Sequence, residues 1–312
     1  MQSPREVLTP DALALLQAVA QAGSFAAAAR ELGVVPSAVT YRIRQIEDAL
    51  DVLLFDRSSR QARLTEAGAE LLREGGRLLL EIDAVANRVK RVATGWESQL
   101  TIAVDTVISC STVMELAEAF FTLAPNTRLR LREESLSGTL EALTSGQADL
   151  ALGVVLDTGS SAGIQTSVLG DITFVYVVAP HHPLASVDGP LPDELVQKHR
   201  AIAAADSVQR GEALTRGLLA GQDVMTVTTM RAKLDAQLRG LGGGFVPEPM
   251  ARPYVESGRL VVKEIRRIAN RQVRLSYAWR SSPAPGRALQ WWLGQLESAA
   301  TRHALLQQHA RA

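Results

Sequence analysis

Polar and basic side chains that can contact DNA gather at the start of one predicted helix. They are Ser37, Thr40, Tyr41, Arg42 and Arg44. Hydroxyl and guanidinium groups of this kind hydrogen-bond base edges and phosphate oxygens when a helix lies in the major groove. No acidic residue occurs between Glu31 and Glu47, so the segment is locally positive. The pattern is typical of a helix that reads duplex DNA, and the N–H groups at its start can take a phosphate.

Three short helices with tight connections must position these side chains. Thr9 and Pro10 begin the first helix, because Thr is a good N-cap and Pro suits the first helical position. Ser24 begins a second, alanine-rich helix, and Pro36 begins the third after a very short connection. Two helices joined in this way let the later one enter the major groove while the earlier one braces it.

A small hairpin is predicted over residues 53–65, and it carries Arg57, Arg60 and Arg63. Arginines on such a wing can contact the DNA backbone or the minor groove. The alternative interpretation of the first 65 residues is a solvated helical bundle that has several surface arginines and no nucleic-acid partner.

A long helix is predicted after the hairpin, with Thr65 as its N-cap and Glu66 in its first turn. Apolar residues recur along it at alternating spacings of four and three, interrupted at Gly75, and this pattern is typical of the seam of a coiled coil. They are Leu71, Leu78, Ile82, Val85, Val89 and Val92. At 1.5 Å per residue, residues 65–92 would extend about 40 Å. A bare helix of that length needs a partner, so we expect a homodimer.

From about residue 98 the pattern changes to alternating strands and helices. Strands are predicted at 100–104, 129–131, 150–154, 173–178, 225–227 and 273–278. Helical stretches lie between them, for example at 113–123 and 137–144. This rhythm indicates a parallel or mixed sheet covered by helices. Residues 287–311 are predicted to form one terminal amphipathic helix.

Composition sets the class of protein. The 312 residues carry 33 Lys+Arg and 33 Asp+Glu, so a DNA function rests on local arrangement and not on bulk charge. The mixed composition argues against a disordered or fibrous chain. The single cysteine, Cys110, cannot form an internal disulfide, and we interpret it as a small packed residue. Without a signal-peptide pattern or a long apolar run, we expect a cytoplasmic protein and no membrane partner.

Enzyme motifs do not emerge from the sequence. The five histidines lack metal-site spacing, and the glycine-rich stretch 240–244 fails the dinucleotide fingerprint because its third glycine position is Phe245. The sequence therefore predicts no enzyme, no catalytic residue, no metal site and no cofactor. Two further alternatives are an exported solute-binding protein, which the N-terminal module disfavours, and a dimeric scaffold without a DNA role.

Several blocks, in the right order, resemble LysR-type transcriptional regulators. Residues 23–32 (GSFAAAAREL) and 36–47 (PSAVTYRIRQIE) are similar to that family's winged helix-turn-helix. Residues 54–57 (LFDR) and 64–68 (LTEAG) are similar to its wing and the entry to its linker helix. Later blocks near 143–153, 180–185 and 240–247 extend the resemblance over nearly the whole chain. Asp51 departs from the usual glycine, and Tyr41 from a residue that is more often Arg or Gln, which suggests an altered base preference.

The resemblance implies a fold and a division of the chain. We expect an α/β protein with a mostly α-helical winged helix-turn-helix at 1–64 and a dimerising linker helix at 65–97. A two-lobed effector domain like a periplasmic binding protein would occupy 98–312. Its lobe I would comprise about 98–168 and 266–300, and its lobe II about 169–265. The implied DNA contacts are Ser24, Pro36, Ser37, Ala38, Thr40, Tyr41, Arg42, Arg44, Arg57, Arg60 and Arg63.

The family position of the effector is between the two lobes. The implied contacts are Asp105, Thr106, Val107, Ser109, Ser135, Ser137, Asp206, Thr228 and Thr229. Helix capping is the competing interpretation of the Ser and Thr residues in this set. If Asp105 points inwards, a ligand with an amine or other hydrogen-bond donors is favoured over a bare carboxylate.

The resulting expectation is a sequence-specific DNA-binding transcriptional regulator that a small-molecule effector controls. The family implies a tetramer made of two dimers and contact with RNA polymerase. Coupling would work by population shift, in which the ligand favours one packing of the dimers and one bend of the DNA.

Overall fold

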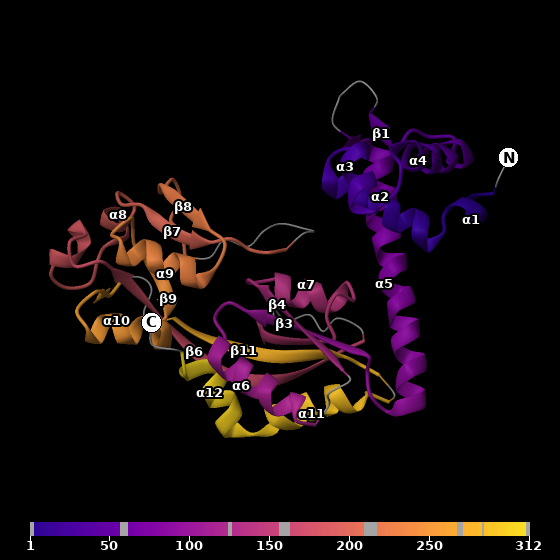
Figure 1. Ribbon diagram of the computed structural model, residues 1–312. Helices are drawn as coiled ribbons and strands as arrows, with labels where there is room; N and C mark the ends of the chain where they lie inside the picture. The colour runs from indigo at the N-terminus through magenta and orange to yellow at the C-terminus, as the bar shows by residue number, and fades with distance from the viewer. Residues whose placement is uncertain are drawn as a thin grey trace. The chain divides into compact units, whose positions relative to one another are not determined.

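The computed structural model describes residues 3–56, 62–123, 127–155, 163–208, 217–266, 271–282 and 284–309. The chain divides into two compact units, Met1–Val89 and Lys90–Ala312. It passes from one unit to the other within a single long helix, α5, which Figure 1 draws in violet. Each unit is described by itself.

The first unit consists of helices and one small hairpin. Its elements are α1 (Pro4–Val7), α2 (Pro10–Ala22), α3 (Phe25–Glu31), α4 (Pro36–Leu50), β1 (Phe55–Asp56), β2 (Arg63–Leu64) and α5 (Glu66–Thr94). The predicted caps are confirmed, because the side chain of Thr9 accepts a hydrogen bond from the Ala12 N–H at 3.3 Å and that of Ser24 from the Ala27 N–H at 3.1 Å. Thr65 likewise accepts from the Gly68 N–H at 3.0 Å at the start of α5.

One apolar core holds the helices of this unit together. Val39, Ile43 and Ile46 of α4 are buried in it, as their spacing of four and three on one helical face requires. The hairpin joins the core through Leu54 and Phe55. The carboxylate of Glu47 accepts from the Leu54 N–H at 2.8 Å and so ties the hairpin to the end of α4. Asp51, at the position where the family usually has glycine, ends α4 in the left-handed conformation with φ 54°.

The predicted seam on α5 is a row of solvent-exposed apolar side chains. Leu78, Ile82, Val85, Val89 and Val92 are between 46% and 87% exposed. Leu71, the first member of the series, packs instead against the core of the first unit. A continuous row of exposed aliphatic side chains at heptad spacing is typical of a helix that pairs with another helix.

The second unit is built on a mixed sheet. Its strands are β3 (Gln99–Asp105), β4 (Arg128–Glu134), β5 (Leu150–Val154), β6 (Ile164–Val178), β9 (Gly244–Pro247), β10 (Val261–Lys263) and β11 (Arg271–Arg280). The order is β10-β6-β11-β5-β3-β4, and β9 also pairs with β6. Strands β3, β4 and β5 run parallel, whereas β6 and β11 are antiparallel. A separate parallel pair is formed by β7 (Ala201–Ala204) and β8 (Val224–Val227).

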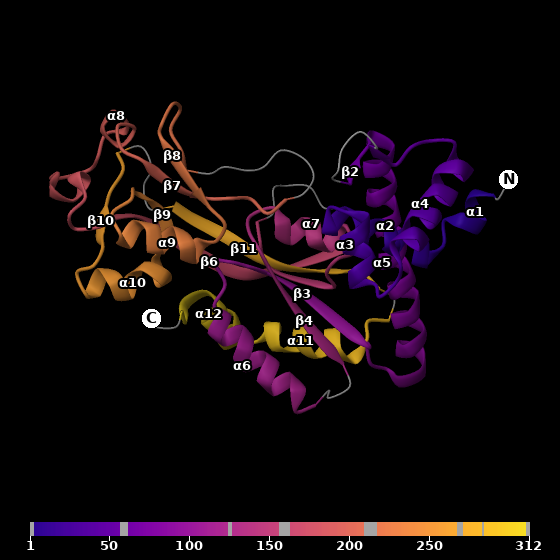
Figure 2. The same cartoon turned by 45° about the horizontal axis from the view of Figure 1, so that its top comes forward.

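Helices cover both faces of the sheet. Figure 2 shows α7 (Gly138–Thr144) above it and α6 (Cys110–Phe121), α11 (Arg287–Glu297) and α12 (Ala299–Gln307) below it. The main core lies on the α6 side, and Phe120 and Trp292 are its largest fully buried side chains. At the other end, α9 (Met230–Leu238) and α10 (Glu248–Glu256) pack on β9 and the end of β6. The short elements η1 (Pro183–Ser186) and α8 (Asp193–Val196) complete this end.

The predicted α/β class and the predicted strands are confirmed, but several details differ. Strand β6 begins at Ile164 and not at residue 173, and strands β7, β9 and β10 were not predicted. The tail forms two helices, because Ser298 leaves the helical conformation at ψ 122° and caps α12. Cys110 is exposed at the start of α6 and is not a packed residue.

No single helix among the described residues is long and apolar enough to cross a membrane. By length and composition alone, the bent pair α2 and α3 passes the test together.

Candidate DNA-reading helix and ligand cavity

Helix α4 presents a polar and basic face to solvent. Six of the seven predicted DNA contacts on α4 are exposed: Pro36, Ser37, Ala38, Tyr41, Arg42 and Arg44. The seventh, Thr40, is partly exposed. Tyr41 is 64% exposed, and its hydroxyl accepts a hydrogen bond from the Gln45 side-chain amide at 3.2 Å. The opposite face of α4 is the buried stripe of Val39, Ile43 and Ile46. The hydrophobic core therefore fixes which side chains α4 offers to a partner.

The charge of this face is not neutralised within the described part of the chain. Arg42 and Arg44 form no ion pair with any described residue, and the first turn of α4 holds no acidic residue. No side chain caps the helix start, where Val35 is the N-cap and Pro36 the first residue. Both the side chains and the helix dipole thus favour an anionic partner.

The predicted DNA contacts outside α4 differ from one another in position and exposure. Arg63 lies on β2 and is exposed. Arg57 and Arg60 lie outside the described residues. The hydroxyl of Ser24 already accepts a hydrogen bond from the backbone of α3, so its role in the first unit is that of an N-cap.

In the second unit, a cavity of about 90 Å³ lies where the strand ends of the sheet meet α9, β7 and β9. Alternate residues of β11, namely Arg271, Val273 and Leu275, line one wall because side chains two apart share a face of a strand. The other lining residues are Asp105, Thr106, Val107, Ser135, Leu136, Gly153, Val155, Phe174, Ala204, Gly217, Met230, Lys233 and Phe245. Ligands of α/β sheets bind at the carboxyl ends of strands, which is where β3 and β5 end here.

Four of the predicted effector contacts line this cavity: Asp105, Thr106, Val107 and Ser135. The others make structural contacts nearby. Ser109 is fully buried and caps α6, and Thr229 caps α9 by accepting from the Ala232 N–H at 3.1 Å. The backbone carbonyl of Thr228 lies 3.4 Å from the Ser135 hydroxyl. Ser109 and Thr229 are therefore helix N-caps, which was the competing interpretation of these residues.

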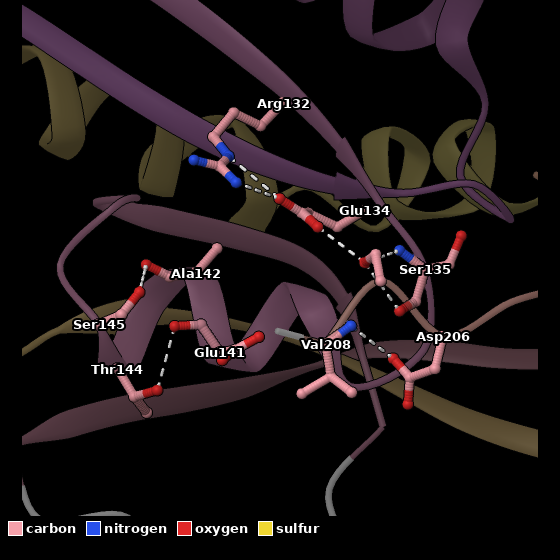
Figure 3. A network of polar contacts seen from close by, with 10 residues as sticks. Arg132, Glu134, Ser135, Glu141, Ala142, Thr144, Ser145, Asp206 and Val208 are labelled. Atoms are coloured by element: carbon pink, nitrogen blue, oxygen red, sulfur yellow. Dashed lines mark hydrogen bonds and ion pairs between the residues drawn. The ribbon is translucent and has the colours of Figure 1, made fainter. Parts of the chain in front are cut away.

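Ser137 and Asp206 belong to a polar network beside the cavity. Figure 3 shows the part of it that contains Glu134, Ser135 and Asp206. Asp206 accepts from the Ser137 N–H at 3.2 Å and the Val208 N–H at 3.1 Å, and from the Ser137 hydroxyl. In the same network the Ser207 hydroxyl donates to Glu134 at 2.7 Å and accepts from the Ser135 N–H at 2.8 Å. These bonds join the loop after β4 to the segment after β7, so polar groups from two distant segments satisfy each other.

Asp105 does face the cavity, and its environment disfavours its charge. It is 5% exposed, and burial raises the pKa of its carboxyl to about 7. Its two oxygens accept from the N–H groups of Val107 and Leu136, each at 2.9 Å. Gly153 permits this arrangement, because a Cβ on that residue would lie 2.7 Å from the Cβ of Asp105.

Two cations of the cavity wall were not predicted. Lys233 of α9 is 6% exposed, and burial lowers the pKa of its ammonium group to about 8. Arg271 of β11 is partly buried. One signal in the sequence marks Lys233: it stands at helical spacing with the buried residues Met230, Leu234 and Gln237, where an apolar residue is usual. Arg271 alternates with Val273 and Leu275 on the inward face of its strand.

Two family models match this chain. Residues 10–69 match the bacterial regulatory helix-turn-helix protein of the lysR family, and residues 93–301 match the LysR substrate binding domain. The chain belongs to the LysR family of transcriptional regulators. Such a regulator has a DNA-binding helix-turn-helix, here α3 and α4, and an effector-binding domain, here in the second unit.

Curated transcriptional regulators are similar in sequence to this chain over most of its length and most of their own. The uncharacterized HTH-type transcriptional regulator YeeY of Escherichia coli K12 is 34% identical over 92% of each chain. The probable HTH-type transcriptional regulator YhaJ of the same strain is 37% identical over 93% of this chain and 96% of its own.

Solved structures of LysR-type regulators share the fold. CbnR matches with a TM-score of 0.60 at 19% identity, over 93% of this chain and 98% of its own. CbnR in complex with its target DNA matches with a TM-score of 0.59 at 19% identity, over 93% and 99%. LysG of Corynebacterium glutamicum with its effector Arg bound matches with a TM-score of 0.51 at 24% identity, over 96% and 98%.

The LysR substrate-binding domain also contains a wider groove of about 580 Å³, on the α6 side of Asp105. Its charged lining includes Arg132, Glu133, Arg231, Asp235 and Arg259. Arg132 bonds Glu134, and Asp235 bonds Arg239. The smaller cavity differs in that it is largely apolar and contains a buried cation with no partner in the described residues.

Proposed function

We propose that this LysR-type regulator reads duplex DNA through α4 and the hairpin, as a homodimer paired along α5. The observation that carries the proposal is the face of α4, where Arg42 and Arg44 stand without a described counter-ion beside an exposed Tyr41. These cations offer hydrogen-bond donors to guanine edges or phosphates, and the core of the first unit holds them on a rigid helix. The proposed DNA contacts are those predicted from the sequence.

The exposed row on α5 supports pairing of two subunits. A second copy of the same row would cover Leu78, Ile82, Val85, Val89 and Val92, and each fully buried aliphatic side chain contributes about 1.5–3 kcal/mol. Pairing two α5 helices brings two α4 helices into one molecule, so we expect an operator with two related half-sites.

We further propose that a small-molecule effector occupies the cavity beside Asp105 and Ser135 and controls DNA binding. The domain limits stay as predicted: 1–64, 65–97 and 98–312, with lobe I at about 98–168 and 266–300 and lobe II at about 169–265. The same proposal includes four further points. Two dimers assemble into a tetramer, the protein contacts RNA polymerase, it is located in the cytoplasm, and it has no enzymatic activity. The effector acts by binding one packing of the subunits more tightly than another.

A selection of binding sites from random duplex DNA tests the DNA-reading role. We expect an inverted repeat to be enriched, with the logarithm of the affinity falling linearly with the logarithm of the salt concentration. If no sequence is enriched at low salt, with or without a pool of metabolites, DNA reading by this chain is wrong.

The control is an arginine outside the proposed surface. Arg5 of α1 is exposed, so Arg5→Ala removes one positive charge from the first unit and leaves every side chain of α4 in place. Arg42→Ala should weaken binding to the selected site at least about fivefold more than Arg5→Ala does. Equal losses would mean that bulk charge and not the face of α4 carries the binding.

A further inference from the structure

Lys233 is the unusual residue of the ligand cavity. Lys233 is 6% exposed, and its ammonium group forms no hydrogen bond or ion pair with any residue that the structure describes. A buried ammonium group without a partner is costly, because the interior cannot replace the lost hydration. A ligand that carries a negative charge into the cavity would compensate this cost.

The charges around the cavity also favour an anion. The charged residues among its described lining are Lys233, Arg271 and Asp105. Arg271, like Lys233, has no ion-pair partner in the described residues. Asp105 is partly protonated near neutral pH, and both of its oxygens already accept backbone hydrogen bonds. Two cations therefore face one weakly charged carboxyl group.

The rest of the wall is apolar. Phe174, Phe245, Met230, Val273 and Leu275 line it together with smaller aliphatic groups. Such a wall binds a hydrocarbon body and cannot solvate a second charge. The cavity volume of about 90 Å³ suits a hydrocarbon body of a few carbon atoms, for example a branched chain or a single ring.

We propose that the effector is a small organic monocarboxylate, whose carboxylate pairs with Lys233 in the field of Arg271 and whose apolar body packs on Phe174, Phe245 and Val273. This inference rests on the proposed effector role of the cavity and names the chemical class that it takes. It reverses the expectation from the sequence, which was based on Asp105 alone and favoured a ligand with an amine or other hydrogen-bond donors over a bare carboxylate.

Asp105 and Lys233 should both make the binding of a carboxylate weaker as the pH rises. The pKa of Asp105 is raised to about 7 by burial, with smaller contributions from Asp206 and Glu133. The pKa of Lys233 is lowered to about 8 by burial. As the pH rises from 6 to 9, the site gains a negative charge and then loses a positive one. The dissociation constant of a carboxylate should rise over this range, and that of its neutral amide should not.

Thermal unfolding and calorimetry of the full chain test the proposal. The probes are 3-methylbutanoate and benzoate, their neutral amides, benzylamine and inorganic phosphate. We expect the two carboxylates to raise the unfolding temperature and to bind at least tenfold more tightly than their amides at pH 6.5. Lys233→Met should abolish this preference. It should fold, because it replaces a buried charge by an apolar side chain of similar length.

Lys198→Met is the matched control, since Lys198 is exposed and does not line the cavity. It should bind the carboxylates as the wild type does. Carboxylate binding that persists in Lys233→Met, or stronger binding of the amide, benzylamine or phosphate, would overturn the monocarboxylate assignment.

Failure of this inference can be told apart from failure of the proposed function. Ala204 lines the cavity, so Ala204→Phe fills it. If a neutral amide or benzylamine binds the wild type and not Ala204→Phe, the cavity is an effector site and only the assigned ligand class is wrong. If no probe binds but the DNA selection succeeds, the carboxylate assignment fails and the DNA-reading role stands.

Discussion

Asp105 shows at the scale of one residue how burial changes chemistry. Its ordinary pKa is 3.8, and in the folded protein burial raises it to about 7. Between these two values the folded state keeps a proton that the unfolded chain has lost. The free energy of unfolding must therefore fall as the pH rises from about 4 to 7, and this contribution becomes constant above pH 7.

The variant Asp105→Asn should not show this decrease in the free energy of unfolding, because its side chain does not titrate. Relative to the variant, we expect the wild type to lose roughly 2 kcal/mol of unfolding free energy between pH 5 and pH 7. All four tryptophans, Trp96, Trp279, Trp291 and Trp292, belong to the second unit, so urea unfolding followed by tryptophan fluorescence reports on it. Asp188→Asn, at an exposed position, is the control. Parallel pH curves for wild type and Asp105→Asn would contradict the assignment.

Arg42 and Arg44 are neighbours on α4 that we expect to act differently. Arg42→Ala should cost about 1–3 kcal/mol at the selected DNA site and relax the base preference at one position, as loss of a base contact does. Arg44→Ala should weaken specific and non-specific binding alike and reduce the salt slope by about 1, as loss of a phosphate contact does. Titrations against the selected and a scrambled duplex at several salt concentrations separate the two. Identical behaviour of both variants would refute the distinction.

At the scale of elements, α5 begins in contact with the hairpin. Gly68 in its first turn lies so close to the chain before β1 that a Cβ would be 2.1 Å from the carbonyl oxygen of Leu54. A backbone carbonyl cannot move aside to make room for a methyl group as easily as the end of a flexible side chain can. Gly76, two turns further on, meets only the end of the Gln17 side chain at 3.1 Å.

The two glycines therefore form a matched pair for alanine substitution. Gly68→Ala should lower the stability of the first unit by about 2 kcal/mol or more, because the start of α5 must move away from Leu54. Gly76→Ala should be neutral or stabilising by up to about 1 kcal/mol, since Ala favours a helix more than Gly. Circular dichroism at 222 nm during urea unfolding measures both. A Gly68→Ala protein as stable as the wild type would show that the two segments do not pack as described.

The seam of α5 gives a second prediction for this element. Ile82→Lys places two positive charges in the proposed dimer contact and removes two apolar side chains from it, so the dimer dissociation constant should rise at least 100-fold. Asp83→Lys, at the next position but off the seam, should leave the dimer intact although its charge change is larger. Analytical ultracentrifugation distinguishes these outcomes. Dissociation in neither variant, or in both, would mean that the seam is not the contact.

At the scale of the whole molecule, regulation requires the cavity of one unit to influence DNA binding by the other. A ligand shifts such an equilibrium only by its difference in affinity for the two states. The long seam-bearing helix α5 belongs to both units, so pairing along it is the step that we expect to transmit the change.

Monomeric protein should therefore bind effector but not respond to it. For Ile82→Lys we expect calorimetry to give an unchanged effector affinity, and the footprint on the selected DNA to be the same with and without effector. The wild type should change its footprint, or its DNA affinity by about 5-fold or more, when effector is added. A full response in the monomeric variant would place the coupling outside the dimer contact.

Local signals made much of the first unit and the sheet strands predictable. The caps Thr9, Ser24 and Thr65 act through bonds to residues three positions away, so a short stretch of sequence contains the whole interaction. The buried stripe of α4 follows from helical spacing in the same way. Strand β6 was predicted too short, because residues 164–172 carry polar side chains that pair with β11, more than 100 residues later.

The sequence by itself determined the classes of element, the exposed polar and basic face of α4 and the heptad row on α5, because each depends on periodicity within one segment. The tertiary structure alone decided the character of the ligand cavity. Asp105, Lys233 and Arg271 come from β3, α9 and β11, and their meeting depends on the sheet order and on the packing of α9. The same burial that brings them together sets the charge of the site, and burial is a property of the whole fold and not of any one segment.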